Sequence, residues 1–201
     1  EISPVAALKI LPGVRADYSD DTANVTVDPR ISARWDVLRL PRRTTLKTGF
    51  GVYHQPPQPQ ESVKPIGNPN IRSSRALQAS LGVEQELADG FDISAEGFYK
   101  WLDDLVVARA DESQLIGARF ENSREGRVFG GEFMLRYRPA GGRLSGWIAY
   151  TLSRSQRRDG RDQDYYVFEY DQTHILSAVA SFKLGRGWTV GLASEAALKC
   201  R

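Results

Sequence analysis

Four aromatic side chains crowd into one short polar stretch of the 201-residue chain and are its best candidates for ligand contact. They are Tyr165, Tyr166, Phe168 and Tyr170. Aromatic rings gathered in an exposed loop can stack on a ligand or close over it. The same rings also suit a girdle at the ends of a set of strands, or packing of the loop on itself. The sequence therefore predicts candidate ligand contacts here and leaves the three roles open.

Two polar residues directly after this stretch, Asp171 and His174, lie where the chain leaves the loop and enters an alternating segment. Side chains at such a junction commonly hydrogen-bond to the backbone and hold the loop in place. We expect a structural role at the loop base and favour it over ligand binding.

Acidic residues in the same region raise the question of carbohydrate hydrolysis or Ca²⁺ binding; they are Asp159, Asp162, Asp164, Glu169 and Asp171. The spacing of a helix-loop-helix calcium site is absent, and the nearby arginines 154, 157, 158 and 161 neutralise the stretch. The two histidines and single Cys200 show no metal-ligand spacing. We expect a solvated loop, no metal, no cofactor and no enzymatic activity.

Overall charge and hydropathy exclude several other classes. The 27 Lys and Arg residues nearly balance the 25 Asp and Glu residues, so the net charge of +2 gives no reason to expect nucleic acid as a partner. No apolar run approaches the roughly 20 residues of a transmembrane helix. The length of apolar runs does not detect membrane-spanning β-strands, because every second residue in such strands is polar.

Strict alternation of apolar and polar residues dominates the chain. From Leu77 to Leu87 apolar residues fall on one face, and after a turn containing Asp89 and Gly90 the pattern resumes at Phe91. Such alternation predicts β-strands, and Asp-Gly predicts a tight hairpin turn. Further alternating runs bring the number of predicted strands to about nine.

The predicted connections alternate between short and long. Short turns fall near 39–44, 88–90, 139–143 and 185–187, and long loops fall near 55–75, 103–124 and 153–173, with a shorter member near 19–28. In an antiparallel meander every second connection lies at the same end, so the long loops share one end. The chain is therefore predicted to be all-β, an antiparallel up-and-down meander forming part of a transmembrane β-barrel wall. Gly130 and Gly131 predict a bend or bulge in that wall.

Several segments, in this order, resemble strands of the TonB-dependent outer-membrane receptor family, within the C-terminal β-barrel domain. They are Val27–Trp35, Leu46–Pro57, Asn68–Arg72, Ala79–Gln85, Phe98–Val107, Asn122–Glu132, Gly146–Ser155 and Asp171–Leu176. Asn122–Glu132, which contains Gly130-Gly131-Glu132, gives the best local match. Together the segments cover nearly the whole chain, and the combination is specific although each part is short.

The resemblance implies a fragment of a receptor that takes up a scarce substrate such as a siderophore, cobalamin or carbohydrate. It implies location in the outer membrane of a Gram-negative bacterium, with outer-membrane lipid, the plug domain and the remaining barrel strands as partners. TonB would act only through an N-terminal region that lies outside this chain, and the fragment alone is not expected to transport. We assign residues 1–192 to the partial barrel and 193–201 to an atypical tail. Two alternatives stay open: a soluble or surface-displayed β-sandwich that binds a partner, such as an adhesin, and a hydrolase on a β scaffold.

Overall fold

The computed structural model describes the chain except residues 21, 66, 110–118, 161 and 200–201. Cys200 therefore lies outside the described residues. The strands are β1 Ile2–Val5, β2 Leu8–Ser19, β3 Asn24–Leu38, β4 Thr44–Gln55, β5 Ser74–Ala88, β6 Phe91–Ala108, β7 Phe120–Tyr137, β8 Leu144–Arg158, β9 Tyr166–Val167, β10 His174–Gly185 and β11 Trp188–Leu198. One short helix, α1, spans Pro59–Ser62 in the β4–β5 connection.

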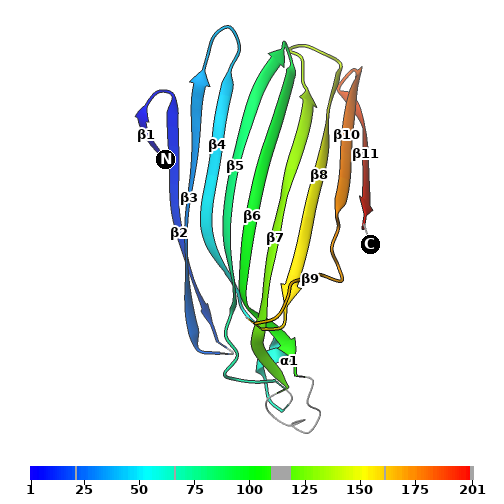
Figure 1. Cartoon of the computed structure of the whole chain (residues 1–201). Helices are drawn as coiled ribbons and strands as arrows, with labels where there is room; N and C mark the ends of the chain where they lie inside the picture. Colours follow the sequence, from blue (N-terminus) through cyan, green and yellow to red (C-terminus); the bar gives the residue numbers. More distant parts are fainter. Residues whose placement is uncertain (21, 66, 110–118, 161, 200–201) are drawn as a thin grey trace.

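The strands form one open antiparallel sheet in the order β1-β2-β3-β4-β5-β6-β7-β8-β10-β11, and β9 pairs with β8 off this path. Nearly every strand therefore lies beside its neighbour in sequence, as the predicted meander requires. The tight turns that follow β3, β5, β7 and β10 lie at one end of the sheet, and the longer connections lie at the other (Figure 1). Gly90, with φ of +79°, supplies the left-handed conformation needed in the β5–β6 turn.

Two predicted details differ from the structure. The sheet contains two short strands that the alternation did not reveal, β1 and β9. The change of pattern at residue 193 does not end the last strand, because β11 continues to Leu198, which pairs with His174. Ser194 and Ala196 lie on the same face as Leu192, and the backbone pairing with β10 continues past them although these two side chains are small.

The two faces of the sheet differ in polarity. Residues directly opposite each other on neighbouring strands share a face, and the apolar face carries rows such as Leu46–Val83–Ala95–Phe133–Tyr150–Leu176. The polar face carries rows such as Lys47–Gly82–Glu96–Glu132–Thr151.

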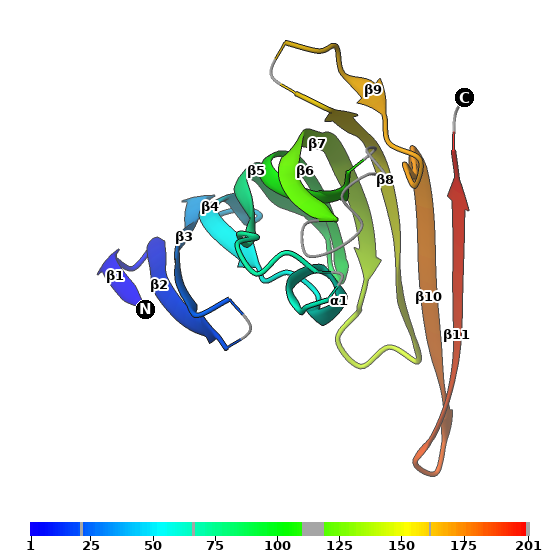
Figure 2. The same cartoon turned by 90° about the horizontal axis from the view of Figure 1, so that it is seen from below.

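Seen along the strands, the sheet is curved and α1 lies within its concave side, at the end of the long loops (Figure 2). Arg157 of the polar face lines a cavity together with Gln58 and Glu61 of the α1 segment, so the polar face is the concave one. The apolar face is consequently convex, and Leu81 on it is 67% exposed. No second layer packs on this face among the described residues.

The glycine pair at 130–131 does not form the predicted bulge. Gly130 and Gly131 pair in unbroken register with both neighbouring strands. A Cβ atom at Gly130 would lie 2.3 Å from the Leu152 carbonyl oxygen, whereas at Gly131 the nearest atom would lie 3.6 Å away. Gly130 therefore allows β8 to approach β7 closely. The register shift instead falls in β6 between Leu102 and Leu105.

Candidate functional site

On β2 to β6 the apolar face forms a band of uncharged rows between the tight turns and the long loops, whereas on β7 and β8 the last two of these rows contain Arg154 and Arg127. On β6 it runs from Phe91 to Trp101, ten residue steps, which span about 34 Å at about 3.4 Å per residue. At a strand tilt of about 40° the band is about 26 Å tall, close to the apolar belt of about 25 Å on outer-membrane barrels. This face is therefore large and uniform enough to be covered by lipid acyl chains.

Aromatic rings border the band at both ends of β6 and β7. Near the tight turns, the rings of Phe91 and Tyr137 lie 4.3 Å apart. Near the long loops, Tyr99 lies 4.3 Å from the ring of Trp101 and 5.8 Å from that of Phe129. Such belts occur where amphipathic rings meet headgroups.

The predicted loop-base residue Asp171 lies at the junction between the β8–β10 connection and the sheet, and only 2% of it is exposed. One carboxylate oxygen accepts the backbone N–H of Ser155 at 2.6 Å, and the other accepts the Thr173 hydroxyl at 2.9 Å. Arg154 lies 3.8 Å from the same carboxylate. These contacts tie the returning loop to the end of β8.

His174 lies in the first position of β10, where its Nδ1 is 2.7 Å from the Tyr150 hydroxyl. Both residues belong to the apolar face, and their rings are nearly parallel at 6.1 Å. His174 therefore packs against β8. Although it is close to Asp171 in sequence, it contacts Tyr150, whereas Asp171 contacts Ser155 and Thr173.

The four predicted aromatic contacts do not form one cluster. The Tyr165 ring lies under the Arg127 guanidinium at 4.1 Å, and the Phe168 ring lies at the same distance from Arg157. Because Arg127 belongs to the apolar face and Arg157 to the polar face, these rings lie on opposite sides of the wall. Tyr170 packs edge-on against Phe168 at 5.5 Å.

Tyr166 lies in β9, which pairs with β8 beyond the point where β10 ends. Its hydroxyl donates to Asp159 at 3.2 Å. Burial raises the pKa of Tyr166, and the Asp159 carboxylate adds to the rise. The phenol therefore stays protonated and able to donate. Tyr170, at 77% exposed, is the most open of the four.

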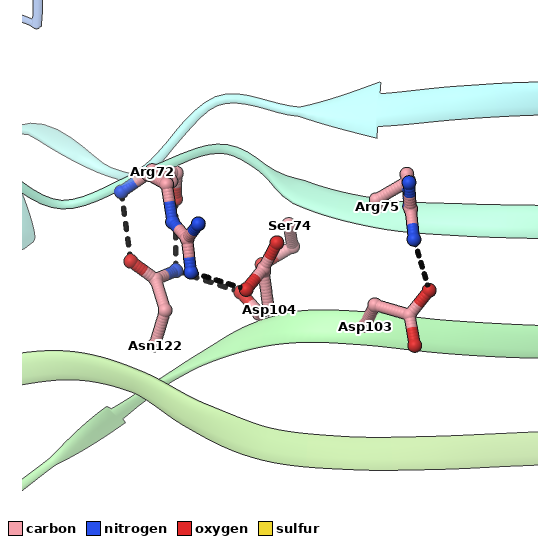
Figure 3. Close-up of polar contacts among 6 residues, drawn as sticks. All are labelled: Arg72, Ser74, Arg75, Asp103, Asp104 and Asn122. Carbon is pink, nitrogen blue, oxygen red and sulfur yellow. Dashed lines mark hydrogen bonds and ion pairs between the residues drawn. The ribbon is translucent and has the colours of Figure 1, made fainter.

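A second loop-base network escaped the sequence analysis (Figure 3). The Asn122 side chain accepts the backbone N–H of Arg72 at 2.8 Å and donates to the Arg72 carbonyl at 2.9 Å. It also donates to the Asp104 carbonyl at 2.7 Å, and the Arg72 guanidinium pairs with the Asp104 carboxylate at 2.7 Å. Asp104 has φ of +55° at the irregular part of β6. One side-chain amide thus replaces the backbone ladder and holds the base of the β4–β5 loop.

The acidic residues of the 159–171 stretch are dispersed. Asp159 pairs with Arg124 at 2.5 Å, and Asp171 is engaged at the loop base. Within the described ranges, no three His, Cys, Asp or Glu side chains gather as a metal site would require. No helix in the described part of the chain is long and apolar enough to cross a membrane.

Comparison with protein families decides the assignment. The family model for the TonB dependent receptor-like β-barrel matches residues 1–196. The chain belongs to this family. TonB-dependent receptor barrels sit in the outer membrane of Gram-negative bacteria and are transporters rather than enzymes. The predicted family and fold are therefore confirmed, and the hydrolase alternative is excluded.

Solved structures agree on the fold. The siderophore receptor PirA from Pseudomonas aeruginosa is 18% identical and has a TM-score of 0.66, with 96% of this chain and 34% of that chain covered. The FrpB iron transporter from Neisseria meningitidis is 11% identical, with a TM-score of 0.63 and 95% and 30% covered. The copper transporter OprC is 17% identical, with a TM-score of 0.60 and 93% and 31% covered. The chain thus spans about a third of the length of these transporters. No match was found among curated proteins.

Proposed function

We propose that the chain forms about a third of the wall of an outer-membrane transporter that takes up a scarce substrate with energy from TonB. The candidate substrates are a siderophore, cobalamin or a carbohydrate. PirA, FrpB and OprC are named for siderophore, iron and copper, which favours a metal or a metal chelate. The plug and the other wall strands would be supplied by the rest of the receptor, so this part alone would not transport.

The observation that carries the proposal is the apolar convex face, which is uncharged on β2 to β6 from the row of Phe91 to the row of Trp101. Its height of about 26 Å, at the tilt of such strands, matches a bilayer belt, and its aromatic borders lie where headgroups begin. Burying this face in acyl chains satisfies its apolar surface, while the polar concave face lines the lumen. A β-sandwich would need a second sheet on the apolar face, and the described residues supply none.

The orientation follows from the connections. Tight turns face the periplasm and long loops face the exterior in barrels of this kind. We place the β4–β5, β6–β7 and β8–β10 loops outside the cell, where they meet substrate first. The exposed rings of Tyr166 and Tyr170 are the better placed ligand contacts, because Tyr165 and Phe168 stack on arginines. We assign Asp171 and His174 to holding the loop base.

A pair of neighbouring positions tests the wall. Leu81 lies on the apolar face and Ser80 on the polar face, and each is replaced by cysteine in a separate variant. Each is introduced into the receptor with Cys200 replaced by serine, labelled with a small fluorophore and reconstituted with brominated lipid. We expect strong quenching at position 81 and weak quenching at position 80. Equal quenching at both positions would refute a lipid-facing convex surface.

Uptake is tested in a Gram-negative strain that lacks its own TonB-dependent receptors and produces the complete receptor. Ferric siderophores, cobalamin and oligosaccharides are supplied in turn as the limiting nutrient. Growth on one of them that disappears when TonB is deleted supports the proposal. Correct membrane insertion without growth on any candidate would leave the wall intact and reject the substrate classes named here.

A further inference from the structure

An arginine that pairs with no carboxylate in the described part of the chain lies in a cavity on the concave face, next to the loop that carries α1 (Figure 2). We propose that Arg157, with Arg124 beside it, binds a carboxylate group of the imported substrate. The inference rests on the proposed function, which places this face in the lumen and the long loops outside the cell. It narrows the substrate to one that carries a carboxylate, either a metal chelate or an acidic sugar, and argues against cobalamin and neutral sugars.

The cavity has a volume of about 290 Å³ and is lined by residues of the β4–β5 loop and of strands β6 to β8. Pro57, Leu105 and Phe168 form apolar walls, and its charged residues are Glu61, Arg124 and Arg157. Ligand pockets commonly measure about 300–1,000 Å³, so this one suits a small group or one arm of a larger substrate. Apolar walls exclude water and so strengthen a contact between opposite charges.

Several contacts fix the position of the Arg157 guanidinium. It stacks on the Phe168 ring at 4.1 Å, and its Nη1 donates to the Ser155 hydroxyl at 3.0 Å and to the Gln156 carbonyl at 2.9 Å. The side chain crosses Gly126 on β7, where a Cβ atom would lie 2.8 Å from the Arg157 Cδ. Within the described ranges, Nε and Nη2 donate to no other group. These two atoms form one edge of the guanidinium, which can make a planar two-point contact with a carboxylate.

The charged neighbours of Arg157 already have partners. Arg124 pairs with Asp159 at 2.5 Å. The Glu61 carboxylate also lines the cavity, but it accepts the Gln58 backbone N–H at 2.7 Å and forms no ion pair with any described residue. The positive charge of Arg157 is therefore the one that a bound anion would neutralise.

The surroundings of Arg157 disfavour its positive charge. Burial lowers the pKa of Arg157, and the positive charge of Arg124 lowers it further, whereas Tyr166 acts in the opposite direction. A guanidinium nevertheless stays protonated at neutral pH. A half-buried cation of this kind is stabilised by a hydrogen-bonded anion. A carboxylate bound at the free edge of Arg157 would supply one.

Arg127 offers a matched control on the other side of the wall. Its guanidinium stacks on Tyr165 at 4.1 Å, the distance at which Arg157 stacks on Phe168, but it belongs to the convex face. Arg157→Gln removes the proposed contact, and Arg127→Gln removes one positive charge outside the lumen. The complete receptor in detergent is titrated calorimetrically with ferric citrate and with trigalacturonate, which carry carboxylates. Cobalamin and maltotriose are the probes without a carboxylate.

We expect one of the two carboxylate probes to bind, and the one that binds distinguishes a metal chelate from an acidic sugar. A hydrogen bond to a charged group is strong enough that Arg157→Gln should weaken this binding about tenfold. Arg127→Gln should bind as the unmodified receptor does. Arg157→Lys retains the charge and should lose less affinity than Arg157→Gln, which also covers a glutamine variant that folds poorly.

The inference is overturned if neither carboxylate probe binds the unmodified receptor, if Arg157→Gln keeps full affinity, or if both glutamine variants lose affinity equally. TonB-dependent growth on cobalamin or a neutral sugar, unchanged in Arg157→Gln, would reject the carboxylate site and leave the proposed transporter standing. Binding of a carboxylate probe through Arg157 without TonB-dependent growth on it would instead keep the site and reject uptake.

Discussion

Removal of the Asp171 carboxylate should loosen the β8–β10 loop while leaving the wall folded. Asp171→Ala leaves the Ser155 N–H without its acceptor at a position that is 2% exposed. A buried donor left unsatisfied costs about 1–3 kcal/mol. The Thr173 hydroxyl can rotate toward another acceptor, and the ion pair with Arg154, whose side chain is 34% exposed, adds little in this setting. The lost backbone contact therefore dominates.

This energy applies to local opening rather than to global unfolding, because the strand pairing of β8 with β7 does not depend on Asp171. Hydrogen exchange of the segment 153–173 should accelerate about tenfold, since 1.4 kcal/mol corresponds to a factor of about ten. Asp171→Asn keeps an oxygen for the Ser155 N–H and should give a smaller change.

Mass spectrometry of peptides from the detergent-solubilised receptor measures the exchange. Asp164→Ala serves as the control, because Asp164 is exposed in the same loop and no hydrogen bond to its side chain is found among the described residues. The loop-base role is refuted if Asp171→Ala exchanges like the unmodified protein. Equal acceleration by Asp164→Ala would attribute the effect to lost loop charge instead.

Three further predictions follow from the wall. Gly130→Ala should destabilise the sheet by about 1–3 kcal/mol through the clash with β8, whereas Gly131→Ala should be nearly neutral; equal melting temperatures would contradict the close approach. Asn122→Ala should expose the β4–β5 loop to limited proteolysis without changing the melting temperature, because it releases the Arg72 backbone; an unchanged cleavage rate would show that the loop is held elsewhere. The chain expressed without detergent should aggregate, since its apolar face lies open; a soluble monomer with a cooperative near-UV melting transition would refute the lipid-facing wall.

Alternation predicted the strands well where one face must be apolar. On β6, from Phe91 to Trp101, each second residue lies on the apolar face that we propose meets the bilayer belt, so the period of two is visible in the sequence. Beyond that belt the requirement ends although the backbone pairing continues. β6 therefore extends to Ala108 and β8 to Arg158, past the points at which the hydrophobic pattern stops.

The details of the loop bases could not be predicted, for a different physical reason. Asn122 bonds to Arg72, 50 residues away, through a side-chain amide that imitates a strand partner. Nothing in local propensity distinguishes this asparagine from any other near a loop. Asp171 and His174 could be proposed from the sequence because they lie directly at the predicted start of β10, and their contacts reach at most 24 residues along the chain.

The meander order has a consequence for how such a wall can change over evolutionary time. Because each main strand pairs only with its sequence neighbours, apart from the step across β9, a hairpin forms a self-contained unit of addition. Insertion or deletion of one whole hairpin alters the circumference and leaves every other pairing in register. Loss of a single strand would instead reverse the direction of all that follow and exchange the inside loops for the outside ones. Such barrels can therefore gain strands two at a time, and the existing loops then stay on the same side of the membrane.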